Sequence, residues 1–308
     1  MFGNFQKTIQ SSIQIKGVGL HNGVKVNLNL KPAEANTGIL FKRTDVDTEK
    51  SIVEANYKNV SSPILCTKIK NSHGVSISTI EHLMAAFYGE GIDNILVELD
   101  APEVPIMDGS SFDFVEAIRS VGTEEQNGQR KFIKVLKKVE IKDGSKHISI
   151  EPLTKDLIID FEIVYNNPLI RTRRKEFKLS NGDLTSIYNS KTFCLYEDID
   201  KIKSQGLAKG GSLENAIVVK ESKILNDDGL RYRDEFVNHK ILDCLGDLML
   251  SGHRIFGHIK TSQGGHHLTN ILLKEFLSNK SNWEFESFKG EQKDQKVSAD
   301  PRPIAVNA

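Results

Sequence analysis

Residues 234–252 read DEFVNHKILDCLGDLMLSG, and their periodicity predicts one long helix. One face of this helix is apolar and must pack into a core; it consists of Ile241, Leu242, Leu245 and Leu248. On another face, His239, Asp243 and Asp247 follow one another at intervals of four, drifting by about 40° per step. The helix therefore directs three polar side chains toward a cleft, unless this stripe is an ordinary solvated, ion-paired face.

Around this helix, the second half of the chain has a clear element order. We predict strands at 132–141, 147–152 and 157–165 before it, and a strand at 254–261 followed by a helix from about His266.

The first half has the same order, with alternating strands at 13–20, 24–30 and 94–100. We predict a helix at 81–91, capped by Thr79 and ended by Gly89 or Gly91. A second helix at 108–122 has apolar positions at Phe112, Val115, Ile118 and Val121. The matching halves predict an α+β fold of two similar domains, each a mainly antiparallel β-sheet packed against two helices (a β-α-α-β sandwich), with a small insertion in each domain.

The polar stretch 122–130, GTEEQNGQR, lies near the middle of the folded part and predicts the domain boundary. We therefore expect an N-terminal domain at 1–125 and a C-terminal domain at 126–288. The C-terminal domain is expected to carry most of the ligands of the metal site described below. Within 185–226, which is too long for a simple connection, we expect an insertion near 192–222. Residues 289–308 are polar and weakly patterned, and predict a flexible tail.

Composition excludes several classes of protein. Lysine plus arginine equals aspartate plus glutamate, at 41 each, so no net field favours nucleic acid. The three cysteines, Cys66, Cys194 and Cys244, have no disulfide or zinc-knot spacing, which favours a reducing compartment. We find no secretory leader and no apolar run of about 20 residues, so we predict a cytoplasmic protein without a transmembrane segment.

A charged pair, Glu81 and His82, lies in the first turn of an otherwise apolar helix. Burying such a pair is energetically unfavourable unless it has a partner, which indicates a functional role. A catalytic Zn²⁺ site uses three protein ligands and leaves a fourth position for water. His82, His239 and Asp243 are candidates for the three ligands, and Glu81 for the general base.

Two further histidines, His266 and His267, follow a pair of glycines where a helix begins. Adjacent helical residues point about 100° apart, so only one of them faces the site, and the residues alone do not choose between them. Either could instead be a helix cap. Cys194 and Cys244 are predicted to fill apolar positions.

Five blocks of sequence, taken together, resemble the UDP-3-O-acyl-N-acetylglucosamine deacetylases of Gram-negative bacteria. They are EHLMAAFYGEGIDNILVELDAPEVPIMDGSS (81–111), KTFC (191–194), KGGSLENAIVV (209–219), DEFVNHKILDCLGDLMLSGHRIFGH (234–258) and GGHHLTN (264–270). The resemblance runs from about Thr8 to about Leu277, with the blocks in the family's order.

The resemblance implies a zinc-dependent hydrolase that removes acetate from UDP-3-O-[(3R)-3-hydroxyacyl]-N-acetylglucosamine, the committed step of lipid A biosynthesis. It implies one zinc per chain, held by His82, His239 and Asp243, with Glu81 activating the water at the metal. It selects His266 as the general acid and oxyanion stabiliser, kept protonated by Asp247. The remaining implied contacts are Thr192 to the carbonyl oxygen, Lys240, Lys146, Tyr165 and Phe193 to the nucleotide-sugar, and Leu213, Ile217, Val218 and Val219 to the acyl chain.

Three residues depart from the family's pattern. Tyr165 lies in a motif where the family more often has phenylalanine and histidine, and His267 takes a place that the family usually gives to a small residue. Cys194 stands where the family usually has glycine, which affects the shape of the cleft near Thr192. A His₂Asp site also accepts Fe²⁺ or Co²⁺.

Two alternative hypotheses remain. One is a zinc amidohydrolase that acts on a different N-acyl amine; the other is a non-enzymatic protein in which zinc only links two domains, which would need a fourth ligand. The sequence is silent on oligomeric state, and a monomer is our expectation.

Overall fold

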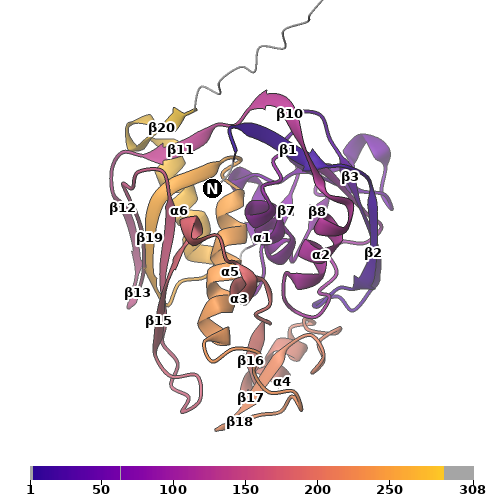
Figure 1. The fold of residues 1–308 in the computed structure, drawn as a ribbon. Coiled ribbons are helices and arrows are strands. Elements are labelled where there is room, and N and C mark those ends of the chain that lie inside the picture. Colours follow the sequence, from indigo (N-terminus) through magenta and orange to yellow (C-terminus); the bar gives the residue numbers. More distant parts are fainter. Residues whose placement is uncertain (1–2, 63, 288–308) are drawn as a thin grey trace, which may run out of the picture.

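The computed structural model describes residues 3–62 and 64–287, so the predicted tail at 289–308 lies outside the described residues. Two β-sheets form the outer layers, and the main helices lie between them (Figure 1). This arrangement is the predicted α+β sandwich, with sheets that are mostly antiparallel. Parallel pairing occurs where β4 (Ile39–Arg43) meets β9 (Ile95–Leu99), where β11 (Phe132–Val135) and β14 (Leu157–Ile163) each meet β19 (Arg254–Ser262), and within the insertion.

The first half contains a five-stranded sheet in the order β2-β3-β9-β4-β5 and a small three-stranded sheet, β6-β7-β8. Its elements are β1 (Phe5–Ile9), β2 (Ile13–Val18), β3 (Lys25–Pro32), β4 (Ile39–Arg43), β5 (Ile52–Glu54), β6 (Val60–Ser62), β7 (Lys68–Lys70), β8 (Ser76–Ile77), α1 (Glu81–Glu90), β9 (Ile95–Leu99), α2 (Phe112–Val121) and β10 (Thr123–Gln129).

The second half is built on a seven-stranded sheet in which β19 is central, since it pairs with β11, β13 and β14. Its elements are β11 (Phe132–Val135), β12 (Val139–Asp143), β13 (Lys146–Glu151), β14 (Leu157–Ile163), β15 (Arg173–Lys178), α5 (Glu235–Met249), β19 (Arg254–Ser262), α6 (His266–Ser278) and β20 (Trp283–Glu286).

An insertion separates β15 from α5 and forms one end of the molecule (Figure 1). It comprises α3 (Thr185–Tyr188), β16 (Phe193–Leu195), α4 (Tyr196–Ser204), β17 (Ile217–Lys220) and β18 (Lys223–Ile224). Strands β16, β17 and β18 form a separate three-stranded sheet, and the insertion predicted near 192–222 lies within this segment.

Helices α1 and α5 pack directly against each other between the two sheets. The approach is close because Gly246 has no side chain; a Cβ there would lie 2.0 Å from the carbonyl oxygen of Glu81. The first turn of α1 is thereby held against the polar face of α5, which brings the predicted site residues of the two halves together.

Three local predictions are wrong. The single strand predicted at 132–141 is interrupted at 136–138, and its two parts, β11 and β12, pair with different neighbours. Thr79 does not cap α1, because it has a positive φ of 58° and its hydroxyl instead donates to Glu103; Ile80 occupies the N-cap position. Phe112 is exposed, and Phe114 is buried in its place together with Val115 and Ile118. Gly91 ends α1 in the left-handed conformation, as one of the two predicted alternatives.

The stretch predicted as the domain boundary is a strand, β10, which pairs antiparallel with β1. It still connects the two sheets, and the domain limits remain a prediction. Among the described residues, no helix is both long and apolar enough to cross a bilayer.

Candidate active site

The three predicted metal ligands meet between α1 and α5. His82, His239 and Asp243 are all buried, and their ligand atoms lie within 4.8 Å of one another. Asp243 Oδ1 is 3.5 Å from His82 Nε2 and 3.4 Å from His239 Nε2. The two imidazole rings lie nearly perpendicular, with centroids 5.0 Å apart. Two histidines and one carboxylate therefore point at a common position.

This donor set suits a divalent cation. Burial lowers the pKa of His239 to about 3, so its ring is neutral, and its Nδ1 lies 3.0 Å from the carbonyl oxygen of Ser190, which leaves Nε2 for a metal. Burial alone would raise the pKa of Asp243, but His239 and Lys240 hold it well below its ordinary value. Asp243 Oδ1 has no hydrogen-bond partner among the described residues, and a buried anionic oxygen needs one. These observations fit a cation at this point.

Glu81 and His266 lie beside the three ligands. His266 Nε2 is 3.7 Å from Glu81 Oε1 and 4.0 Å from Asp243 Oδ2. The other ring nitrogen, Nδ1, is 2.7 Å from Asp247 Oδ2. Burial alone would lower the pKa of His266, but Asp247 and Glu81 outweigh it and raise the pKa to about 10. His267 is exposed, so the structure places His266, and not its neighbour, against these carboxylates.

A cavity of about 350 Å³ opens next to these side chains. The four residues predicted to contact the nucleotide-sugar all line it: Lys146, Tyr165, Phe193 and Lys240. Thr192 and His266, which were predicted to be catalytic, line it as well. Phe193 packs edge-on against Tyr165, with centroids 5.6 Å apart, and Lys240 Nζ lies 5.7 Å from the Phe193 ring centroid. Lys240 also donates to Asp243 Oδ2 at 2.8 Å, so this residue both lines the cavity and contacts a predicted metal ligand.

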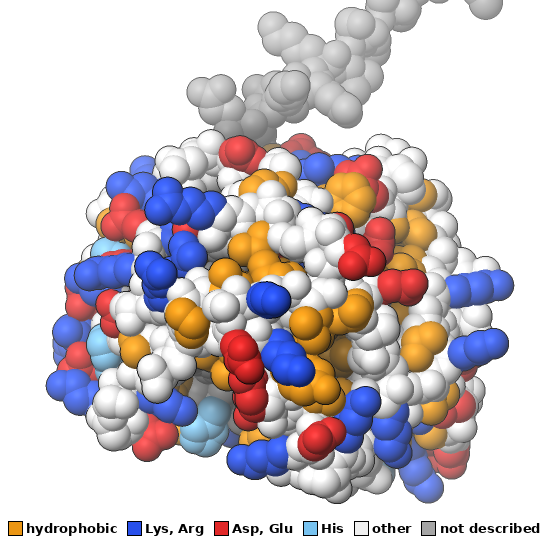
Figure 2. Space-filling model, turned by 90° about the horizontal axis from the view of Figure 1, so that it is seen from below, with side chains coloured by type: hydrophobic (Ala, Val, Ile, Leu, Met, Phe, Trp, Pro, Cys, Tyr) orange, Lys and Arg blue, Asp and Glu red, His pale blue; other side chains and the backbone are white. Residues whose placement is uncertain are grey.

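A second, more apolar cavity of about 390 Å³ adjoins the first under the insertion. Leu213 and Val218 line it, whereas Ile217 and Val219 belong to the hydrophobic core because alternate residues of β17 point to opposite sides. The two cavities share Leu65, Thr192, Phe193, Cys194 and Ile202. Figure 2 views the molecule from the end that the insertion forms and shows apolar side chains around a hollow on that face.

Three buried residues at this site carry no signal in the sequence: His21, Thr67 and Glu103. His21 lines the apolar cavity, and neither of its ring nitrogens has a hydrogen-bond partner among the described residues. Glu103 accepts from the backbone N–H groups of His21 and Asn22. Thr67 donates to Asp247, which is 180 positions away in the chain. No spacing pattern reveals contacts of this range.

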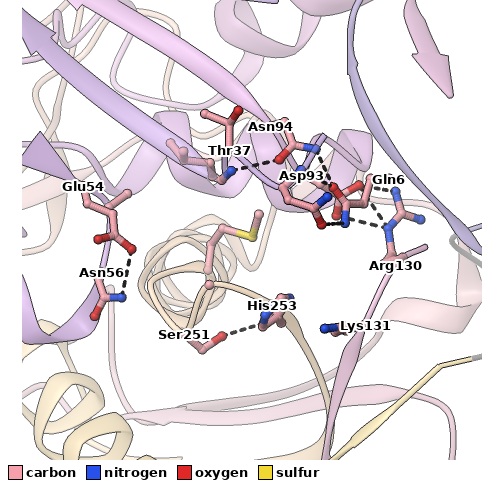
Figure 3. A pocket seen from close by; sticks show the side chains of 16 residues that line it. Gln6, Thr37, Glu54, Asn56, Asp93, Asn94, Arg130, Lys131, Ser251 and His253 are labelled. Atoms are coloured by element: carbon pink, nitrogen blue, oxygen red, sulfur yellow. Dashed lines mark hydrogen bonds and ion pairs between the residues drawn. The ribbon is translucent and has the colours of Figure 1, made fainter. Parts of the chain in front are cut away.

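A further cavity, of about 310 Å³, lies between the two halves and away from these side chains (Figure 3). Its lining includes Asp93, Arg130 and His253, and it includes none of the predicted catalytic, metal-binding or substrate-binding residues.

Comparison with known proteins gives a consistent result. The LpxC family, described as UDP-3-O-acyl N-acetylglycosamine deacetylase, matches residues 6–278. A protein of Actinobacillus succinogenes named UDP-3-O-acyl-N-acetylglucosamine deacetylase is 45% identical over 291 residues, which cover 94% of this chain and 95% of the relative. Proteins of the same name from Pasteurella multocida and Aliivibrio fischeri are each 44% identical over 290 residues, covering 93% of this chain and 94% of the relative. The chain therefore belongs to the UDP-3-O-acyl-N-acetylglucosamine deacetylase family.

Proposed function

We propose that the protein hydrolyses the acetamide of UDP-3-O-[(3R)-3-hydroxyacyl]-N-acetylglucosamine to the free amine and acetate in lipid A biosynthesis, using one bound Zn²⁺. The observation that carries this proposal is the convergence of His82, His239 and Asp243 beside Glu81 and His266, with His266 lining the first of two adjoining cavities. The names of the relatives support the substrate.

His82, His239 and Asp243 are the residues that would hold the cation. When bound, it supplies a Lewis acid that polarises the amide carbonyl and lowers the pKa of water. Fe²⁺ would suit the same two nitrogens and one oxygen.

Glu81 is the proposed general base. Burial, the largest influence, raises its pKa, which brings this carboxylate closer to the operating pH than an exposed glutamate. It takes a proton from the water that attacks the amide carbon. The Thr192 hydroxyl donates to the carbonyl oxygen as negative charge develops there.

His266 is the proposed general acid. Asp247 accepts its Nδ1–H, which fixes the ring and directs the Nε2–H toward the reacting groups. The proton passes to the sugar nitrogen as the carbon–nitrogen bond breaks, which gives the neutral amine and acetic acid. The acetic acid releases its proton to become acetate, and the proton that Glu81 took from water returns to His266.

The two cavities account for substrate recognition. Lys240 and Lys146 provide cationic contacts for the diphosphate, and Tyr165 and Phe193 provide aromatic surface for the nucleotide-sugar. The acyl chain occupies the apolar cavity lined by Leu213 and Val218. Ile217 and Val219 support that cavity from the core rather than lining it.

Acetate release should be measured with metal-stripped protein, with zinc-reloaded protein and with zinc-reloaded Glu81→Gln. We expect zinc to restore activity, and the variant to bind one zinc but to lose about 100-fold or more in kcat. Glu116→Gln, on the exposed side of α2, is the control and should retain full activity. If zinc-loaded protein releases no acetate from this substrate, the deacetylase proposal fails, and N-acyl amines without UDP become the substrates to test.

A further inference from the structure

Thr67 lies in the loop between β6 and β7, and only 2% of its surface is exposed. It belongs to the first half of the chain, yet it contacts catalytic candidates from both halves. Every hydrogen-bonding group of this residue is engaged in or beside the active site.

The main chain of Thr67 fixes the start of α1. Its N–H donates to Glu81 Oε2 at 3.0 Å, and its carbonyl oxygen accepts from the N–H of Ile80 at 3.5 Å. One oxygen of the Glu81 carboxylate is thereby committed to the main chain. The other, Oε1, is the one that faces His266 Nε2 at 3.7 Å.

The side chain of Thr67 acts on the other carboxylate. Its hydroxyl donates to Asp247 Oδ1 at 2.6 Å, while Asp247 Oδ2 lies 2.7 Å from His266 Nδ1. Both oxygens of Asp247 therefore have a defined partner, and its carboxylate plane cannot rotate without breaking one of these bonds. Asp247 is itself buried, so an oxygen that lost its donor would remain unsatisfied.

We propose that Thr67 is a positioning residue that aligns both members of the acid–base pair, its N–H orienting Glu81 and its hydroxyl orienting Asp247 and, through it, His266. This inference rests on the proposed function. Side-chain substitution removes only the hydroxyl contact and retains the backbone contact, so the two effects are separable. A valine at this position keeps the shape of threonine but lacks the donor.

The test uses the zinc-loaded full-length chain with Thr67→Val and Thr67→Ser. We expect Thr67→Val to lower kcat by about 10- to 100-fold, which is the loss typical of residues that hydrogen-bond to an active-site group and orient it. KM should change by less than about twofold. Thr67→Ser restores the hydroxyl and should recover kcat to within about threefold of the original. Zinc stoichiometry should stay at one in both variants.

Thr8→Val is the matched control. Thr8 is also a buried threonine, on β1, and its hydroxyl oxygen accepts from the N–H of Ala33 far from the catalytic side chains. It should lose stability with no change in kcat. If Thr67→Val behaves in the same way, or if Thr67→Ser is as impaired as Thr67→Val, the positioning role is wrong.

A double-mutant cycle tests the route through Asp247. In an Asp247→Ala background, Thr67→Val should cost no more than about twofold in kcat, because the contact is already absent. Independent effects of the two substitutions would overturn the inference. If Thr67→Val does not fold, Thr67→Ala replaces it in the same cycle. An original protein that binds zinc but releases no acetate would refute the proposed function instead, which separates the two failures.

Discussion

At the residue scale, the site depends on carboxylates whose surroundings differ. Burial raises the pKa of Glu81, whereas His239 and Lys240 outweigh burial and hold that of Asp243 well below its ordinary value. One carboxylate is therefore suited to accept a proton, and the other to remain an anionic ligand. The two roles follow from the neighbours rather than from the residue type.

His266 and His267 give a direct comparison of two adjacent residues. We expect His266→Gln to lower kcat by about 100-fold or more, because glutamine cannot donate the proton that the leaving amine needs. His267→Gln should change kcat by less than about threefold, since its exposed side chain lines the nucleotide-sugar cavity but has no hydrogen bond to Asp247 of the kind that His266 makes. Steady-state kinetics of both variants, with zinc content verified, checks this; equal losses in kcat would contradict the assignment.

At the scale of elements, the contact between α1 and α5 is the feature that brings the proposed metal ligands together. Glycine in a helix interior normally costs about 1 kcal/mol relative to alanine. Gly246 lies at a point where a Cβ atom would collide with the main chain of α1. The conformational cost of glycine is thus offset by a close helix approach.

We predict that Gly246→Ala destabilises the protein by about 1–3 kcal/mol, because overpacking pushes the two helices apart. Zinc affinity should fall as well, since His82 lies on one helix while His239 and Asp243 lie on the other. Denaturant unfolding and metal competition measure the two effects. A gain in stability of about 1 kcal/mol, as expected for an uncrowded helix glycine, would show that the contact is not tight.

Strand β17 shows how alternation selects residues for the apolar cavity. Val218 points into it, and we predict that Val218→Phe shortens the space for the acyl chain. Displacing two methylenes, at about 0.8 kcal/mol each, corresponds to about 15-fold in kcat/KM for a long-chain substrate. A substrate with a 3-O-acetyl group should be unaffected and serves as the internal control. A uniform loss across chain lengths would argue against an acyl role for this cavity.

At the scale of the whole molecule, Asp93 joins the two halves. Its carboxylate pairs with Arg130, at the junction between β10 and β11, and with Arg254 at the start of β19. Figure 3 shows Asp93 and Arg130 side by side at the cavity between the halves. Burial alone would raise the pKa of Asp93, but Arg254 and Arg130 outweigh it and lower the pKa.

We predict that Asp93→Asn costs about 3–5 kcal/mol in the free energy of unfolding at neutral pH, because it removes one partner of a buried ion pair. A depressed folded-state pKa stabilises the fold above the unfolded value of about 4, and this contribution is lost as the pH falls through the folded value. The stability difference between the original protein and the variant should therefore shrink in acid. Urea unfolding between pH 7 and pH 3 tests this, and a constant difference would contradict it.

Local patterns in the sequence predict the fold class and several of the candidate site residues. Periodicity predicted α5, β19 and several other strands, among them β3, β9, β13 and β14, because burying one face imposes a repeat of 3.6 or 2 residues. The spacing of four aligned His239, Asp243 and Asp247, because contacts within a helix are local. The family resemblance selected His266, which the helical spacing alone left undecided.

The remaining features depend on contacts between residues that are far apart in the sequence. Thr67 meets Asp247 across 180 positions, Gly246 meets Glu81 across the helix interface, and His21 enters a cavity formed by other elements. Thr79 was predicted to cap a helix, but the buried Glu103 carboxylate engages its hydroxyl. Such contacts depend on how the elements pack, which local sequence patterns do not specify.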